Sequence, residues 1–355
     1  MTAIRAGVIG YGLAGRVFHA PMIDAVDGLE LAAVVERSGR NAEARYPGIV
    51  TYPSLEAMLE DPSLELIVVA TPNALHASQA MQALRAGRHV VVDKPVGNSS
   101  QEIAAMMATA QESGRLLIPY HNRRFDGDFR TLRSLLANRR LGRVVSLEST
   151  FDRWRRQPRP ELWRDAGGDG TGTLLDLGTH LVDQIVQLFG LPEAVSGEVL
   201  VERDAARAVD SFTVRMHYAG WTATAAANCL AAQPRPRYRV RGMDGDFVKW
   251  GLDPQEERLK VNNSTVTDAL GVETESAWGT LVTETAEGMR KETVPTEPGD
   301  YRLYYAGVRD ALQGKAAPPV TAMDAWCVAR ILEMAEQSTR ERRWVECDWS
   351  QTPKA

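Results

Sequence analysis

The stretch GVIGYGLAGRVFHA, residues 7–20, decides the fold of the first part of the chain. Gly10, Gly12 and Gly15 have the spacing G-x-G-x-x-G, between an apolar run and a helical pattern. In such a turn the first glycine bends the chain, the second lets the backbone approach a pyrophosphate, and the third lets the helix pack on the strand. The free N–H groups of the helix start favour an anion. The stretch predicts a dinucleotide site, although the same spacing also suits a purely structural turn.

The segments that follow this turn alternate between strand and helix patterns. Short apolar runs at 29–35, 65–71, 88–93 and 115–120 are separated by helical patterns at 15–26, 77–87 and 100–114. This alternation predicts βαβ units that build a parallel sheet. We therefore expect a doubly wound Rossmann domain over residues 1–120.

The second part of the chain has a different texture. Long alternating segments at 144–154, 210–229 and 236–251 are typical of antiparallel strands with one solvated face. The Asp-Gly pair in MDGDF, residues 243–247, indicates a tight hairpin, and residues 322–343 have the period of a helix. We expect an α+β domain over residues 121–355 with a large, mainly antiparallel sheet. The whole chain is then an α/β protein of two domains.

Composition excludes several classes of protein. Hydrophobic residues make up 44% and charged residues 25%, and a net charge of -5 gives no basic surface for nucleic acid. No run of about 18 uncharged apolar residues and no signal-peptide pattern is present, so we expect a cytoplasmic protein without a membrane partner. Three distant cysteines and six histidines without HxH or HExxH spacing predict neither a disulfide framework nor a metal site.

The end of the second predicted strand bears on the choice of cofactor. Glu36 follows the last glycine of the turn by about 20 residues, where an acidic residue accepts from the ribose 2'-hydroxyl of NAD. Arg37, Ser38 and Arg40 follow at once and could instead hold the 2'-phosphate of NADP. The residues favour NAD slightly and leave NADP open.

Two further strands end in polar residues. Thr71, Pro72 and Asn73 follow one of them, and Asp93 and Lys94 follow another. Ligands of open α/β sheets bind at this carboxyl edge. A charged pair at the end of a buried strand is costly unless it is paired or functional, whereas a lysine that reaches solvent is the plain alternative.

The stretch GTGTLLDLGTH, residues 170–180, places Asp176 and His180 four residues apart after a run of glycines. On a regular helix both side chains point to the same side, where Asp176 would orient the imidazole or bind a substrate hydroxyl. The alternatives are a carboxylate stabilised by the helix dipole and an ordinary buried histidine.

Taken together, these motifs resemble the Gfo/Idh/MocA oxidoreductase family over nearly the whole chain. The stretches that carry the resemblance are the glycine turn, FHAP (18–21), TPNALH (71–76), DKP (93–95), HNRRFDGDF (121–129) and GTGTLLDLGTHLVDQ (170–184). FHAP, HNRRFDGDF and GLDPQEERL (251–259) are most similar to the branch with NADP-dependent scyllo-inositol dehydrogenases. Two departures are conservative: the family usually has Glu-Lys-Pro at 93–95 and three glycines at 170–172.

The resemblance implies roles for individual residues. Lys94, Asp176 and His180 are expected to be catalytic. The expected cofactor contacts are Gly10, Tyr11, Gly12, Leu13, Ala14, Gly15, Glu36, Arg37, Ser38, Thr71, Pro72, Asn73, His76, Asp93, Lys94, Pro95 and Asn122. The expected substrate contacts are Lys94, Arg123, Trp163, Arg164, Asp176 and His180.

The implied activity is an NAD(P)-dependent dehydrogenase for the secondary alcohol of a cyclic polyol or sugar, such as scyllo-inositol or an aldose, in a homodimer or homotetramer. The chemistry suits the residues, since a histidine exchanges protons near neutrality and a lysine stabilises alkoxide character. Relatives of this fold act on other carbonyls or glycosides, and a non-catalytic NAD(P)-sensing or sugar-binding regulator is the alternative from another class.

Overall fold

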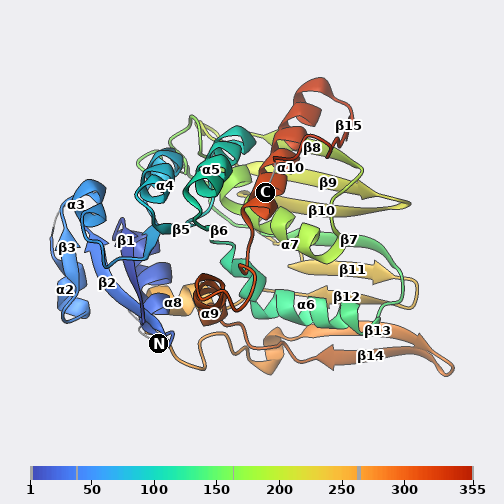
Figure 1. Ribbon diagram of the computed structural model, residues 1–355. Helices are drawn as coiled ribbons and strands as arrows, with labels where there is room; N and C mark the ends of the chain where they lie inside the picture. The colour runs from blue at the N-terminus through green and yellow to red at the C-terminus, as the bar shows by residue number, and fades with distance from the viewer. Residues whose placement is uncertain (1–2, 37–38, 163, 262–264, 354–355) are drawn as a thin grey trace.

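The computed structural model describes residues 3–36, 39–162, 164–261 and 265–353. Over these residues the strands form one sheet of six strands and one of nine. Figure 1 shows the first sheet, in blue to teal, beside the second, which runs from green to orange with its edge strand β15 in red, and the last long helix in red next to α5. The predicted class, a Rossmann sheet followed by an α+β domain, is confirmed.

The first sheet is parallel throughout. Its strands in spatial order are β3 (Val50–Tyr52), β2 (Leu29–Val35), β1 (Ile4–Ile9), β4 (Leu66–Val69), β5 (His89–Val92) and β6 (Leu117–Pro119). The helical segments between them are η1 (Gly15–His19), α1 (Ala20–Asp24), α2 (Asn41–Arg45), α3 (Leu55–Leu59), η2 (Asn73–Leu75), α4 (His76–Arg85) and α5 (Ser100–Ser113). β3 was not among the predicted strands, because three residues are too few for a pattern.

Both faces of this sheet are buried. Along β4, Val68 packs into one hydrophobic core while Ile67 and Val69 pack into the other. Side chains alternate between the two faces of a strand, so a strand covered on both sides must be apolar at every position. This burial explains why the strands read as continuous apolar runs in the sequence.

The second sheet is mainly antiparallel, with one parallel pair between β10 and β7. Its strands in spatial order are β14 (Gly288–Val294), β13 (Gly279–Thr285), β12 (Gly245–Lys249), β11 (Tyr238–Gly242), β7 (Val144–Thr150), β10 (Trp221–Asn228), β9 (Ser211–Tyr218), β8 (Ala194–Leu200) and β15 (Val345–Glu346). The helical segments of this half are η3 (Asn122–Phe125), α6 (Gly127–Ala137), η4 (Leu174–Gly178), α7 (Thr179–Phe189), α8 (Gln255–Val261), η5 (Glu275–Ala277), α9 (Arg302–Leu312) and α10 (Ala322–Glu341).

The hairpin predicted at residues 243–247 forms, but its turn is not the Asp-Gly pair. Met243 and Asp244 connect β11 to β12, and Gly245 already belongs to β12. A Cβ at Gly245 would lie 2.3 Å from the carbonyl oxygen of Val282 in the neighbouring strand. The glycine is therefore explained by the close approach of β13 and not by turn geometry.

Segments from the second half of the chain return to the first sheet. Tyr304 and Tyr305 of α9 pack into the same core as Val8 of β1, and Trp326 of α10 packs into the core on the other face. The division of the chain after residue 120 stays a prediction, since both halves contribute side chains to these cores. No helix within the described ranges is long and apolar enough to cross a membrane.

Candidate active site

The glycine turn lies between β1 and the helix that begins the first βαβ unit. Gly10 has a φ of +91°, which L side chains rarely adopt, and a Cβ at Gly15 would lie 2.1 Å from the carbonyl oxygen of Gly10. A Cβ added at Gly12, in contrast, would have no other atom within 4 Å. Two of the glycines are thus required by the backbone itself, while Gly12 faces open space at the helix start, where an anion would bind.

Glu36 lies at the end of β2, and its carboxylate is partly engaged. One oxygen accepts from the side-chain amide of Asn41 and the other from the backbone N–H of Ala42 at 3.3 Å, so Glu36 holds the start of α2. Arg40 is exposed and pairs with Glu43 at 3.3 Å. Arg37 and Ser38 lie outside the described residues. A carboxylate has acceptor capacity beyond two bonds, so the choice between NAD and NADP stays open.

The loops after β4 and β5 are tied together and to the glycine loop before η4. Asn73 donates from its side-chain nitrogen to the carbonyl oxygen of Gly170 at 2.8 Å. The ring of His76 is 1% exposed, with Nε2 2.8 Å from the carbonyl oxygen of Thr71 and Nδ1 2.8 Å from that of Pro95. Since two backbone carbonyls occupy its ring nitrogens, His76 acts on the site by positioning these loops. This differs from the direct cofactor contact expected for it.

Three cationic side chains surround the buried carboxylate of Asp176. Lys94 Nζ donates to Oδ1 and to the backbone oxygen of Asp176, both at 2.8 Å. Arg164 Nε lies 3.1 Å from Oδ1, and Arg153 Nη1 lies 3.3 Å from Oδ2. Burial alone would raise the pKa of Asp176, but Lys94, Arg164 and Arg153 hold it well below its usual range. Asp176 therefore remains ionised and fixes the position of the Lys94 ammonium.

His180 follows Asp176 on the same helical segment and is 4% exposed. Burial, together with the charges of Lys94 and Arg123, lowers its pKa well below the ordinary value, so the ring is neutral at neutral pH. Its buried Nδ1 has no hydrogen-bond partner among the described residues. The expectation that Asp176 orients the imidazole is thus not met, because Asp176 bonds to Lys94 instead.

The backbone explains this difference. Asp176 lies in η4, a π-helical turn, whereas His180 lies in the first turn of α7. A π-helical turn holds more residues than an α-helical one, so a spacing of four no longer stacks the two side chains as on a regular helix. Such turns inside α-helices occur frequently at functional sites.

Arg123, which was expected to contact substrate, is instead 6% exposed and already paired. Nη1 donates to Asp126 Oδ2 at 3.0 Å, and Nη2 donates to Glu256. Burial would raise the pKa of Glu256, but Arg123 and Lys260 lower it to about 2. Arg123 therefore holds Asp126 and Glu256 in place close to the site. Trp163 lies outside the described residues.

Three side chains near the site were not among the sequence candidates: Arg153, His121 and Glu256. Arg153 belongs to the same arginine-rich stretch as Arg164, and His121 precedes Asn122 in a quoted motif, but nothing local marks either as a neighbour of the site. Asn122 itself is 8% exposed at the start of η3. No three His, Cys, Asp or Glu side chains within the described ranges are grouped to hold a metal.

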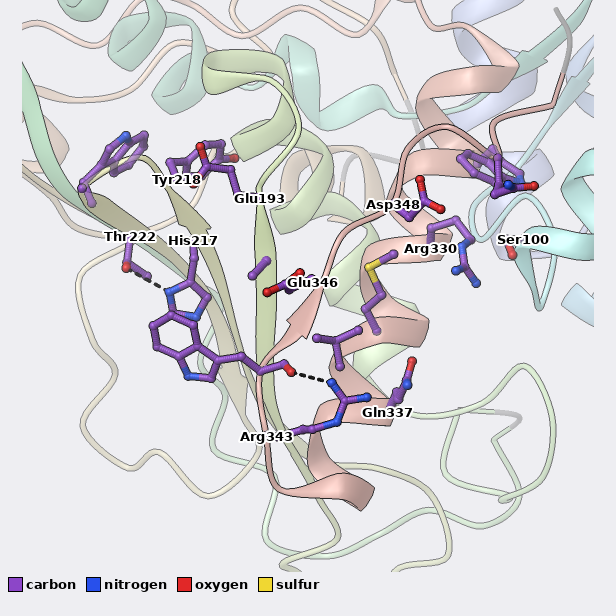
Figure 2. Close-up of a pocket in the computed structure, with 18 residues that line it drawn as sticks. Ser100, Glu193, His217, Tyr218, Thr222, Arg330, Gln337, Arg343, Glu346 and Asp348 are labelled. Atoms are coloured by element: carbon purple, nitrogen blue, oxygen red, sulfur yellow. Dashed lines mark hydrogen bonds between the residues drawn. The ribbon is translucent and has the colours of Figure 1, made fainter.

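A wide pocket lies away from this cluster, between α10, β9 and β15 (Figure 2). Its volume is about 1290 Å³, and His217 stacks on Trp344 at one wall with ring centroids 3.8 Å apart. None of Lys94, Asp176 and His180 lines it. Its size therefore does not make it the candidate active site.

Comparison with known proteins defines the class of the chain as oxidoreductase. One family model, described as the NAD-binding Rossmann fold of an oxidoreductase family, matches residues 4–121, and another, described as the C-terminal alpha/beta domain, matches residues 133–347. The chain therefore belongs to the Gfo/Idh/MocA oxidoreductase family.

Similar proteins cover almost the full length of the chain. The scyllo-inositol 2-dehydrogenase (NADP+) IolW of Bacillus subtilis is 34% identical over 96% of this chain and 95% of its own length. The uncharacterized oxidoreductase YdgJ of Escherichia coli is 40% identical, over 96% of this chain and 97% of its own. Among solved structures, that of the protein YPO2259 from Yersinia pestis has a TM-score of 0.93 at 38% identity, and the match covers 99% of both chains.

Proposed function

We propose that the chain is an NAD(P)-dependent dehydrogenase that moves a hydride between the nicotinamide and a secondary alcohol of a cyclic polyol or sugar. Scyllo-inositol and aldoses are the first substrates to test, and the name of the Bacillus relative supports the inositol. The observation that carries the proposal is the pairing of the Lys94 ammonium with Asp176 beside a neutral His180, at the carboxyl edge of the Rossmann sheet.

The residues at this edge fit a dinucleotide. The open space next to Gly12 would accept the pyrophosphate. Glu36 and Thr71 follow β2 and β4, the strands on either side of β1, and Asn73 begins η2 just beyond Thr71. When bound, the nicotinamide supplies the acceptor or donor for the hydride. NAD and NADP both remain candidates: Glu36 favours the first, and the NADP-dependent relative supports the second.

Lys94 and His180 act on the substrate hydroxyl in different ways. Two N–H groups of the Lys94 ammonium are engaged by Asp176, which leaves the third to donate to the substrate oxygen and stabilise its alkoxide character. The neutral His180 takes the hydroxyl proton during oxidation and returns it during reduction. Lys94 polarises the oxygen, and His180 moves the proton.

The test mixes the purified protein with NAD+ or NADP+ and a panel of inositol isomers and pyranoses, and follows nicotinamide reduction. Lys94→Ala should lower kcat by roughly a hundredfold or more while cofactor binding survives. Lys291→Ala on the exposed strand β14 serves as the surface control. A rate with one cofactor and one ring stereochemistry would support the proposal. Cofactor binding without turnover on any member of the panel would favour another carbonyl substrate or a sensing role.

A further inference from the structure

A cavity of about 500 Å³ lies behind the helix start that carries Asp176 and His180. It is lined by residues 95–99, by residues 168–171 of the glycine loop and by one side of α10. Leu175 and Thr179 face it from the catalytic helix, whereas Asp176 and His180 are not in its wall. At about 30 Å³ for each molecule, the cavity has room for several waters.

The cavity connects a buried imidazole with the surface. His121, 2% exposed, forms part of its wall, and Asp169 and Arg207, both exposed, form another part. Both ring nitrogens of His121 are buried without a hydrogen-bond partner among the described residues. A buried imidazole without partners is unfavourable, so a neighbouring polar group or water is expected to satisfy it.

His121 also lies next to His180. The two ring centroids are 6.4 Å apart at an interplanar angle of 78°, within reach of one bridging water. The unpartnered Nδ1 of His180 is the second nitrogen that an imidazole needs to pass a proton onward. We propose that His121 relays the proton between His180 and water in this cavity, so that the proton leaves behind the catalytic helix. The relay rests on the proposed function, in which His180 takes the hydroxyl proton.

The relay balances the oxidation. The carbon–hydrogen bond breaks with both electrons going to the nicotinamide, and the hydroxyl proton passes to His180. His180 gives its Nδ1 proton to His121 through one water, and His121 gives a proton to cavity water that exchanges with solvent. Both histidines end neutral with the proton on the opposite ring nitrogen. Reduction along the same path in reverse, or proton exchange of each ring with water between turnovers, restores the starting tautomers. A proton thus leaves even while substrate and cofactor cover the front of the site.

Burial and the charges that face His121 keep its ring neutral, with one ring nitrogen unprotonated. Burial lowers its pKa, as do the cations of Arg124 and Lys94, whereas Asp183 and Asp324 act in the opposite direction. Arg124 and Asp183 largely neutralise each other, because they form two hydrogen bonds of 2.8 and 2.6 Å. His121 is therefore neutral between proton transfers.

The activity test uses His121→Ala, with His217→Ala as the control, since His217 lines the wide pocket of Figure 2 and not this cavity. Acid–base groups contribute roughly 100- to 10,000-fold, and a relay that water can partly replace should contribute less, so we expect kcat to fall about ten- to a hundredfold. Added imidazole should restore the rate of His121→Ala, since the cavity beside it admits the ring. The affinity for NAD(P)H should stay within about twofold in both variants, as expected for a group that does not touch the cofactor.

A second measurement needs neither cofactor nor turnover. In protein labelled with nitrogen-15 histidine, His121→Asn should shift the ring-nitrogen signals of His180, and His217→Asn should not. An unchanged His180 spectrum, or a His121→Ala enzyme that keeps the full rate, would overturn the relay. A loss of rate that imidazole does not repair would also count against it. A wild-type protein that turns over no polyol would instead refute the proposed function, and the spectra would still decide whether the two rings are coupled.

Discussion

Replacing Asp176 with asparagine would remove the carboxylate that Lys94, Arg153 and Arg164 share, at almost constant volume. Breaking a buried ion pair by removing one partner costs about 3–5 kcal/mol. Here the three cations keep 15%, 19% and 38% of their side chains exposed, so water compensates them in part. We therefore expect Asp176→Asn to destabilise the fold by about 1–3 kcal/mol at neutral pH.

The cost should depend on pH in a definite direction. The pKa of Asp176 is depressed in the folded protein, since the attraction of Lys94 and the two arginines outweighs the effect of burial. Its ionised form therefore stabilises the fold fully above the ordinary aspartate pKa of about 3.9, and this stability is lost as pH falls below that value. The difference between wild type and Asp176→Asn should be largest near neutrality and shrink below about pH 4.

Activity should fall as well, because a neutral amide replaces the carboxylate that anchors one Lys94 N–H group, while the bond to the backbone oxygen of residue 176 remains. A displacement of a reacting group by about 1 Å can cost about a hundredfold in rate, and we expect a loss of kcat of this order. Asp152→Asn is the matched control, since Asp152 has a side-chain exposure of 1% and pairs with Arg235 at 2.6 Å. It follows β7 beside Arg153 but points to the opposite side of the extended chain.

The assay combines urea unfolding at several pH values with steady-state kinetics of both variants. Asp152→Asn should lose stability while it keeps kcat, whereas Asp176→Asn should lose both. The reasoning would be refuted if Asp176→Asn had wild-type stability and rate at neutral pH, or if its stability deficit grew on acidification.

Three further predictions concern the cofactor turn and the reacting groups. Lys94→Ala should lower kcat by roughly a hundredfold or more with little change in NAD(P)H affinity, as kinetics and fluorescence titration would measure. Gly12→Ala should fold normally and lose cofactor affinity, since its Cβ would enter open space, whereas Gly15→Ala should lower the thermal midpoint because its Cβ would lie 2.1 Å from the Gly10 oxygen. In a pH–rate profile, kcat/KM for alcohol oxidation should stay high well below pH 6.5 and fall only as pH approaches the depressed pKa of His180; an acid limb centred at the ordinary histidine value would contradict a buried base.

Local patterns were sufficient for the architecture. The glycine spacing at 10–15 and the apolar runs of β1, β2, β4, β5 and β6 reflect burial and backbone geometry over a few neighbouring residues. Those constraints act on residues that are close together in the chain, so the sequence alone was sufficient to predict the Rossmann sheet. The hairpin turn shows the limit of this approach, since Gly245 is explained by a strand 37 positions away at Val282.

The candidate site required more than local pattern. Lys94 and Asp176 meet across 82 positions, and Arg153 approaches Asp176 across 23. Periodicity carries no signal for such pairs, and the arginine-rich stretch offers no local reason why Arg153 should face the site while Arg156 is exposed. The π-helical turn at η4, which separates Asp176 from His180, is likewise decided by packing around that helix.

The sequence by itself therefore determined the fold class, the glycine turn and the residue types that the chemistry needs, because each depends on near neighbours along the chain. Only the tertiary structure decided that Asp176 bonds to Lys94 and not to the imidazole, that Arg123 pairs with carboxylates, and that His121 lies beside His180 and lines a cavity. These facts depend on which distant elements pack together. Ion pairs and buried imidazoles acquire their partners only in the folded chain, where burial removes competing water.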